Sequence, residues 1–385
     1  LLAFSPSSTN HFGYGFGYTK RNISGTFIDG SVGFLDFDRS FSSEKREERV
    51  SYLRFVKPLI NRYMHWTYGL EMTLHKTRNF YNIDSLYLSN YKYKYHIVDA
   101  WGTWNIDADK VGRYNYADRL HRLLSLRILE QHFSQRPLNI NQYSYRYSDV
   151  RAVLVNISVF KQNFYKTRYI YGFGRNEDVP EGGEASLTTG YTNINGRNRP
   201  YGALNFQRYY FTNAQHYYNY TFRIGAYLHQ SKLEDINILA SLDYFSRLYQ
   251  LNDKWKQRIF LNISAARQIK SIYNDPLVLE SEYGLSEFQN NSFGANSRIT
   301  ARGESVFFSP LSLMFFKFAP FVFANASVLN IKTANSYHNK LYSALGGGIR
   351  IRNESLIFGT IELKGMYFPR KNFFQGRWIK HAGWW

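Results

Sequence analysis

The chain has 385 residues and no cysteine, which excludes a disulfide framework and thiolate metal sites. Its net charge is +19, but the basic residues are scattered through loops and polar faces, which argues against a nucleic-acid-binding protein. No stretch approaches the roughly 20 continuous apolar residues of a spanning helix, so a helical membrane protein is excluded.

Large apolar residues stand at every second position in segments throughout the chain. In the clearest segment, Trp66, Tyr68 and Met72 alternate with Thr67 and Thr73. This two-residue period predicts strands with one apolar and one polar face. In chain order, the predicted strands are 11–20, 30–41, 49–57, 64–77, 91–104, 149–161, 184–192, 200–211, 218–230, 235–248, 255–269, 298–309, 316–327, 341–351 and 357–368.

Two kinds of connection separate these strands. Tight turns containing Asn, Asp or Pro are expected at 57–61, 251–253 and 352–354, because these residues fit bends that a strand cannot make. Longer polar stretches are expected as loops at the opposite end of the sheet, at 78–90, 270–297 and 328–340.

Residues 105–183 interrupt the two-residue period. The leucine-rich stretch 116–133 fits a helix about as well as a strand, and 169–173 is a candidate for a further short strand. With this region included we expect about sixteen strands. The alternating glycines Gly13, Gly15 and Gly17 lie within one predicted strand, so we interpret them as small residues on its polar face and not as a phosphate-binding loop.

The composition indicates which face of the sheet is apolar. The chain has 33 Tyr, 31 Phe and 7 Trp, and its mean hydropathy is only -0.44. Membrane barrels place aromatic residues at both lipid interfaces and keep a polar lumen. We therefore predict an all-β transmembrane antiparallel β-barrel over residues 1–368, with a tail or incomplete last strand over 369–385. Its tight turns would face the periplasm and its long loops the exterior.

No pattern of residues points to catalysis. The chain lacks HExxH and GxSxG motifs and any paired-carboxylate group. His65 and His75 are ten residues apart on one predicted strand, too far to share a metal ion. We expect no enzymatic activity, no metal and no cofactor. Because Leu1 does not begin a signal peptide, we interpret the chain as a mature or trimmed piece of its protein.

The last third of the chain contains an ordered series of motifs. A loop with Gly284, Leu285, Ser286, Glu287 and Phe288 comes first. A strand with Arg298, Arg302 and Glu304 follows and ends at Pro310, then a strand with Phe323 and Asn325, then the glycine-rich segment 346–351. This order resembles the BamA/TamA outer-membrane assembly family. The resemblance implies an extracellular loop folded into the lumen, where it faces a wall formed by these strands.

The chain departs from the family motifs at two matched positions. Ser286 stands where the family has a loop arginine, and Asn325 stands where it has a lumen aspartate. Joint loss of both charges avoids the cost of a lone buried charge, so we expect the loop to remain inside, held by hydrogen bonds and by Phe288. Glu287 then needs a partner, for which Arg298 and Arg302 are candidates. The alternative is that Ser286 and Asn325 are ordinary loop and strand residues.

The resemblance further implies insertion or translocation of proteins or lipids at the outer membrane of a Gram-negative bacterium. It implies a seam between the first and last strands, represented by Tyr14, Phe16, Ile361 and Leu363. The expected partners are outer-membrane lipid, lipopolysaccharide, client or partner membrane proteins, and a periplasmic domain or partner missing from this chain. Two alternatives remain: a closed barrel serving as a pore or as a scaffold of a larger complex, and a soluble basic β protein that binds nucleic acid.

Overall fold

The structure is a computed structural model, and it describes residues 2–6, 12–43, 45–61, 64–108, 120–140, 144–273, 276–288, 294–332, 336–353, 359–370 and 378–384. Within these residues the chain forms one antiparallel sheet of twenty strands, two of which have only two residues. The strands are β1 (Leu2–Pro6), β2 (Phe12–Lys20), β3 (Asp29–Arg39), β4 (Arg46–Lys57), β5 (Trp66–Thr77), β6 (Lys94–Asn105), β7 (His121–Gln135), β8 (Val150–Arg168), β9 (Asn176–Ile194), β10 (Arg197–Phe211), β11 (Tyr217–His229), β12 (Lys232–Phe245), β13 (Tyr249–Gln250), β14 (Lys256–Ile269), β15 (Ala295–Phe308), β16 (Ser312–Leu313), β17 (Phe316–Lys332), β18 (Tyr337–Asn353), β19 (Ile361–Tyr367) and β20 (Trp378–Trp384).

The predicted all-β architecture is confirmed. The one α-helix among the described residues is α1 (Asp84–Asn90), and η1 (Ile23–Gly25) and η4 (Tyr145–Tyr147) are single turns of 3-10 helix. No helix in this part of the chain is long and apolar enough to cross a membrane. The ambiguous stretch 116–133 forms strand β7 from residue 121 onward, whereas 116–119 lie outside the described residues.

Each long strand pairs with the next long strand in the chain, so successive connections alternate between the two ends of the sheet. The predicted tight turns at 57–61 and 251–253 fall at one end, which we call end A. Of the turn predicted at 352–354, Arg352 and Asn353 belong to strand β18, which ends at end A, and residue 354 lies outside the described residues. The predicted loops at 78–90 and 270–297 fall at the other, which we call end B. The third, at 328–340, is mostly strand, because β17 and β18 continue their pairing to Lys332 and Tyr337.

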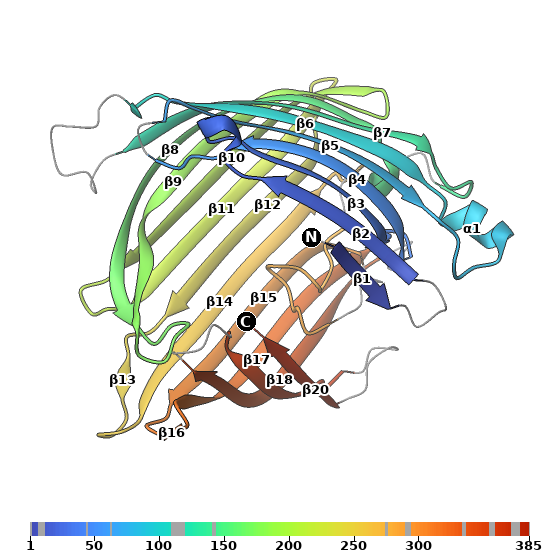
Figure 1. Cartoon of the computed structure of the whole chain (residues 1–385). Helices are drawn as coiled ribbons and strands as arrows, with labels where there is room; N and C mark the ends of the chain where they lie inside the picture. Colours follow the sequence, from blue (N-terminus) through green and yellow to red (C-terminus); the bar gives the residue numbers. More distant parts are fainter. Residues whose placement is uncertain are drawn as a thin grey trace.

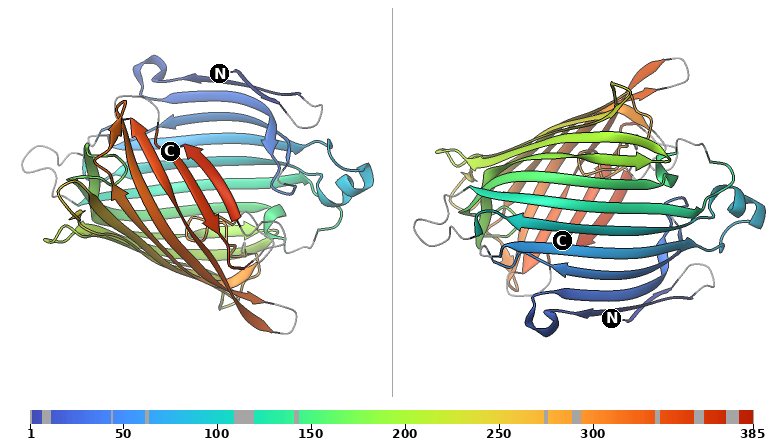
Figure 2. Two further views of the ribbon diagram at one scale, coloured as in Figure 1. Left: turned by 90° about the horizontal axis from the view of Figure 1, so that it is seen from below. Right: turned by 90° about the horizontal axis from the view of Figure 1, so that it is seen from above.

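Figure 1 shows that the sheet curls around an interior, and Figure 2 shows the C-terminal strands (orange to red) crossing at an angle over strands from the middle of the chain (cyan to green). The polarity of the sheet is the reverse of that of a soluble protein. On β5, the side chain of Leu74 is 58% exposed and that of Thr73 only 9%. The alternation places the large apolar residues on the outer face and the polar residues on the inner face.

The outer apolar face is continuous across neighbouring strands. Ile157, Leu187, Leu204, Ile224 and Ile238 are successive register partners on β8 to β12. The glycines of β2 lie on the opposite, inner face, as predicted. There Gly13 lies against the ring of Phe37, and Gly17 lies close to the hydroxyl of Tyr52. The absence of a side chain at these glycines therefore lets aromatic side chains of β3 and β4 pack closely against β2.

The sheet extends one strand beyond the predicted seam at each end. Tyr14 and Phe16 lie on β2, which pairs with β1 and β3; Ile361 and Leu363 lie on β19, which pairs with β18 and β20. Within the described residues the edges are β1 and β20, with five and seven residues. β1 is too short for a sequence pattern to identify it, and β20 lies in the segment 369–385 that was predicted as a tail or incomplete last strand.

The predicted short strand at 169–173 is wrong. These residues form the connection between β8 and β9, where Tyr169 has a φ of 62°. The backbone N–H groups of Ile170, Tyr171 and Gly172 donate to the carboxylate of Glu177 and not to a neighbouring strand. The Glu177 side chain thus takes the hydrogen bonds that these N–H groups would otherwise make to a neighbouring strand.

We expect Gly190→Ala on β9 to destabilise the sheet, because a Cβ there would lie 2.1 Å from the carbonyl oxygen of Val153. The expected loss is about 1–3 kcal/mol in urea unfolding. Gly202→Ala on the neighbouring strand β10 is the control, since no heavy atom lies within 4 Å of its added Cβ. Equal effects of the two substitutions would contradict the close approach at Gly190.

Candidate functional site: an interior loop and a charged wall

The β14–β15 connection folds onto the inner face of the sheet. Leu285 and Phe288 are fully buried there, in an apolar cluster with inner-face residues of β17, β18 and β19. The ring of Phe288 meets the rings of Phe368 and Tyr342 edge to face, at centroid distances of 4.9 and 5.8 Å. We call residues 276–288 the interior loop.

Polar contacts fix the interior loop to three strands. Asn325 on β17 donates its Nδ2 hydrogen to Glu287 Oε1 at 2.8 Å. Arg298 on β15 donates to Ser281 Oγ at 2.6 Å and to the carbonyl of Val278. Ser264 on β14 donates to the carbonyl of Tyr283 at 2.9 Å. Burial raises the pKa of the Tyr283 hydroxyl, and the nearby Arg223 guanidinium partly opposes this rise.

The geometry changes the predicted partners within the interior loop. Asn325 contacts Glu287, the residue that follows Ser286, so the expected pairing is displaced by one position. Arg298 donates to Ser281 and to the carbonyl of Val278, and Arg302 donates to Asn262 Oδ1 at 2.9 and 3.1 Å. Gly284 lies so close to the carbonyl of Leu279 that an added Cβ would be 2.0 Å away.

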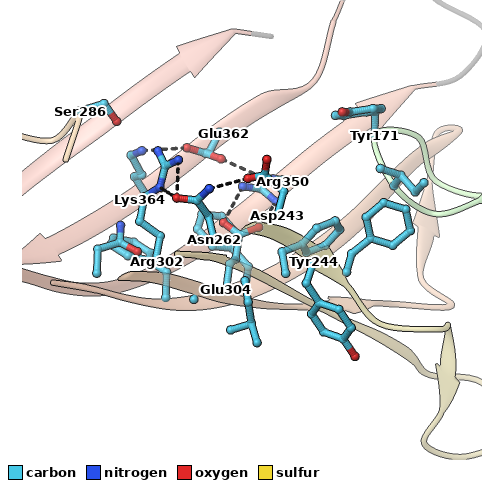
Figure 3. A pocket seen from close by; sticks show the side chains of 18 of the residues that line it. Tyr171, Asp243, Tyr244, Asn262, Ser286, Arg302, Glu304, Arg350, Glu362 and Lys364 are labelled. Atoms are coloured by element: carbon cyan, nitrogen blue, oxygen red, sulfur yellow. Dashed lines mark hydrogen bonds and ion pairs between the residues drawn. The ribbon is translucent and has the colours of Figure 1, made fainter. Parts of the chain in front are cut away.

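A row of alternating charges follows the inner face beside the interior loop. Arg350 on β18 makes two hydrogen bonds to Glu304 on β15, at 2.6 and 2.8 Å, and one to Glu362 on β19 at 2.8 Å. Glu362 is 2% exposed and also contacts Lys364 at 3.2 Å. Figure 3 shows this row; β18 and β19 are neighbours, and β17 lies between β15 and β18. We call these four residues the charged wall.

The charged wall borders a cavity of about 770 Å³ inside the curled sheet. Ser286 and Glu287 of the interior loop reach it, and so does Phe323 of β17. Its charged lining consists of four basic and four acidic side chains, so the cavity presents no field of a single sign. The basic residues are Arg302, Arg350, Arg352 and Lys364, and the acidic residues are Asp243, Glu287, Glu304 and Glu362.

A second ion pair holds the base of the β14–β15 connection. Arg199 on β10 is fully buried and contacts Asp235 on β12 at 2.6 Å. The Arg199 guanidinium also lies over the ring of Tyr227, 4.3 Å from its centroid. Asp235 Oδ1 accepts hydrogen bonds from the backbone N–H groups of Ile272 and Tyr273. The pair therefore fixes the point at which the chain leaves β14.

The structure gathers most, but not all, of the predicted site residues. The five residues of the loop motif, Arg298, Arg302, Glu304, Phe323 and Asn325 lie around one interior region. Tyr14, Phe16, Ile361 and Leu363 lie elsewhere, on β2 and β19. Arg350 belongs to the glycine-rich segment 346–351 of the motif series, whereas Glu362 and Lys364 were not among the predicted site residues. Their two-residue spacing along β19 was a usable signal.

Among the described residues, no group of three His, Cys, Asp or Glu side chains could hold a metal ion. No model of a protein family matches the chain, and no curated protein matches it. Among solved structures, the chain is similar to BamA from Haemophilus ducreyi lacking POTRA domains 1–3. The TM-score is 0.47 and the identity 11%, over 98% of this chain and 68% of that one.

We expect Asn325→Asp to weaken the seating of the interior loop, because it places a second carboxylate against Glu287. The expected loss is roughly 1–3 kcal/mol, measured by thermal unfolding and by proteolysis within the loop. Adding Glu287→Gln should restore most of it, because the Gln amide can donate to the new carboxylate. A double variant as unstable as the single one would show that the two side chains do not meet.

We expect Arg199→Met to cost about 3–5 kcal/mol, because it leaves the Asp235 carboxylate buried without its cation. Arg151→Met is the matched control: Arg151 pairs with Glu130, and its side chain is 71% exposed, so at most about 1 kcal/mol is expected. Urea unfolding of the two variants gives the comparison. Similar losses in both would show that Arg199 does not anchor the loop base.

Proposed function

We propose that this chain is an outer-membrane β-barrel of a Gram-negative bacterium that acts in the insertion or translocation of proteins or lipids. The membrane part of the proposal rests on the reversed polarity of the sheet. Its outer face carries continuous rows of apolar side chains, while charges and hydroxyls point inward. A surface of this kind is stable against lipid and costly in water.

The insertion part rests on one observation: within the described residues, β1 and β20 each pair on one side only. A strand edge with free N–H and C=O groups is a template for an incoming strand. Inside a bilayer such groups are costly unless they are paired. The sheet therefore has a short edge strand on each side, and these two edges support backbone pairing with a strand of a client protein.

A second candidate is a closed barrel that serves as a pore or as a scaffold of a larger complex. The cavity of about 770 Å³ beside the charged wall favours a passage through the interior. The interior loop argues against such a passage, because Leu285 and Phe288 pack against the inner face of β17, β18 and β19. A wide, permanent conductance is therefore not expected from this chain.

Two adjacent residues of β9 test the membrane placement. Leu187 is 47% exposed on the outer face, whereas Ser186 is its neighbour on the inner face. We expect Leu187→Arg to reduce the free energy of folding into phospholipid vesicles by about 2–4 kcal/mol. Ser186→Arg should have a much smaller effect. If Leu187→Arg were neutral or stabilising, a soluble β protein would be the better description.

A reconstituted assay tests insertion directly. An unfolded outer-membrane barrel protein is added to phospholipid vesicles that contain the full chain, and its folding is followed by gel mobility without heating. We expect folding to be several-fold faster than in empty vesicles, because the edge strands supply pairing partners. A variant lacking residues 378–385, and with them β20, should lose most of the acceleration.

The controls separate the two candidate functions. Gly202→Ala, which adds a methyl group in open space, should leave the acceleration unchanged. Conductance measurements on the same vesicles detect a pore. No acceleration together with a stable conductance would reject the insertion proposal in favour of a pore. Acceleration that persists without β20 would show that this edge is not the template.

A further inference from the structure

The connection between β8 and β9 folds inward at end A. We call residues 169–175 the strap. Phe173 of the strap is 4% exposed and packs against Val306 and Phe308 of β15 and against Phe321 of β17. Its ring lies edge to face with that of Phe308 at a centroid distance of 5.9 Å. The strap therefore docks on strands that lie more than a hundred residues later in the chain.

Cations on β14, β17 and β18 donate hydrogen bonds to backbone carbonyls of the strap and of the residue before it. Lys317 Nζ on β17 donates to the carbonyl of Phe173 at 2.9 Å. Arg258 Nη2 on β14 donates to the carbonyl of Arg168 at 2.8 Å. Arg352 on β18 makes a longer contact, 3.5 Å, with the carbonyl of Tyr171. Charge-assisted hydrogen bonds of this kind are among the stronger ones.

The strap is also shaped by its own hairpin. The carboxylate of Glu177 accepts hydrogen bonds from Ile170, Tyr171 and Gly172 at 2.7–2.9 Å. Gly174 has a φ of 117°, a conformation that L side chains rarely adopt. The strap therefore holds its shape by local bonds, and its docking to β14, β15, β17 and β18 is a separate set of contacts.

The strap and the interior loop reach the same cavity from opposite ends. Ile170 and Tyr171 of the strap line it, and so do Ser286 and Glu287 of the interior loop. In Figure 3, Tyr171 and Ser286 lie on opposite sides of the charged wall. The strap belongs to end A and the interior loop to end B. Because the lining charges balance, the arrangement fits a chamber between two closures better than a site for one charged ligand.

We propose that the strap is a second closure of the interior, placed in series with the interior loop. In this arrangement a solute crosses the barrel only when both segments have left the inner face. The undocking of the strap breaks the contacts of Phe173 and Lys317 but keeps the bonds to Glu177. The strap can therefore swing as a preformed unit.

The docking is tested first without a membrane. In the cysteine-free chain, Phe173→Cys with Phe308→Cys should form a disulfide in detergent micelles, because the two side chains meet. Phe173→Cys with Glu280→Cys is the control, since Glu280 belongs to the interior loop at end B, and it should form none. Equal yields of disulfide in the two variants would overturn the docking.

The series arrangement is tested by conductance of the full chain in planar phospholipid bilayers, a measurement that rests on the membrane placement proposed above. The strap variant is Phe173→Ala with Lys317→Met, and the loop variant is Leu285→Ala with Phe288→Ala. Each alone should leave the conductance near that of the unmodified chain. The variant that combines all four substitutions should have a conductance several-fold above the sum of the increases caused by the strap variant and the loop variant.

Lys254→Met is the control for the lost charge, because Lys254 is an exposed residue of an end A turn; it should change nothing. Full conductance from either variant alone would overturn the closures in series. An unchanged combined variant would also overturn them, provided that it inserts into the bilayer. If no variant inserts, the membrane placement fails, and the disulfide yield still decides whether the strap docks.

Discussion

The structure depends on one constraint: the sheet carries its polar residues on the concave face, where each buried charge needs a partner. A lone buried charge costs several kcal/mol, whereas a charge with good hydrogen bonds is tolerated. The charged wall meets this need by alternating its signs, with Arg350 between Glu304 and Glu362. Arg199 and Asp235 meet it as a pair. Arg350 and Glu362 join the neighbouring strands β18 and β19, whereas the Arg350–Glu304 and Arg199–Asp235 pairs each reach across an intervening strand.

The same constraint explains how two connections come to lie inside. A loop that enters a polar interior must satisfy its backbone, because peptide groups removed from water need hydrogen-bond partners. The interior loop receives such bonds from Arg298 and Ser264, and the strap receives them from Lys317 and Arg258. Apolar anchors then add specificity: Phe288 in one case and Phe173 in the other. Both segments use cations of the C-terminal strands.

Sequence alternation found the long strands and their faces, and its failures have physical causes. The edge strand β1 was missed because its five residues carry too short a period, whereas β20 lies in the segment 369–385, which was predicted as a tail or incomplete last strand. Residues 169–173 read as a strand because the pattern cannot register the carboxylate of Glu177, which captures three N–H groups of the backbone. The interior loop was expected to face the strand with Asn325, but the pairing to Glu287 instead of Ser286 follows from the path of the loop.

The sequence by itself determined the all-β architecture, the reversal of polarity and the order of turns and loops, because these follow from local periodicity and turn chemistry. Only the tertiary structure decided which strands form the edges, how the charged wall is paired and where the strap lies. Those features depend on contacts such as Lys317 with Phe173, which are 144 residues apart. No local pattern encodes such a contact, since it exists only after the sheet has curled and brought its two halves face to face.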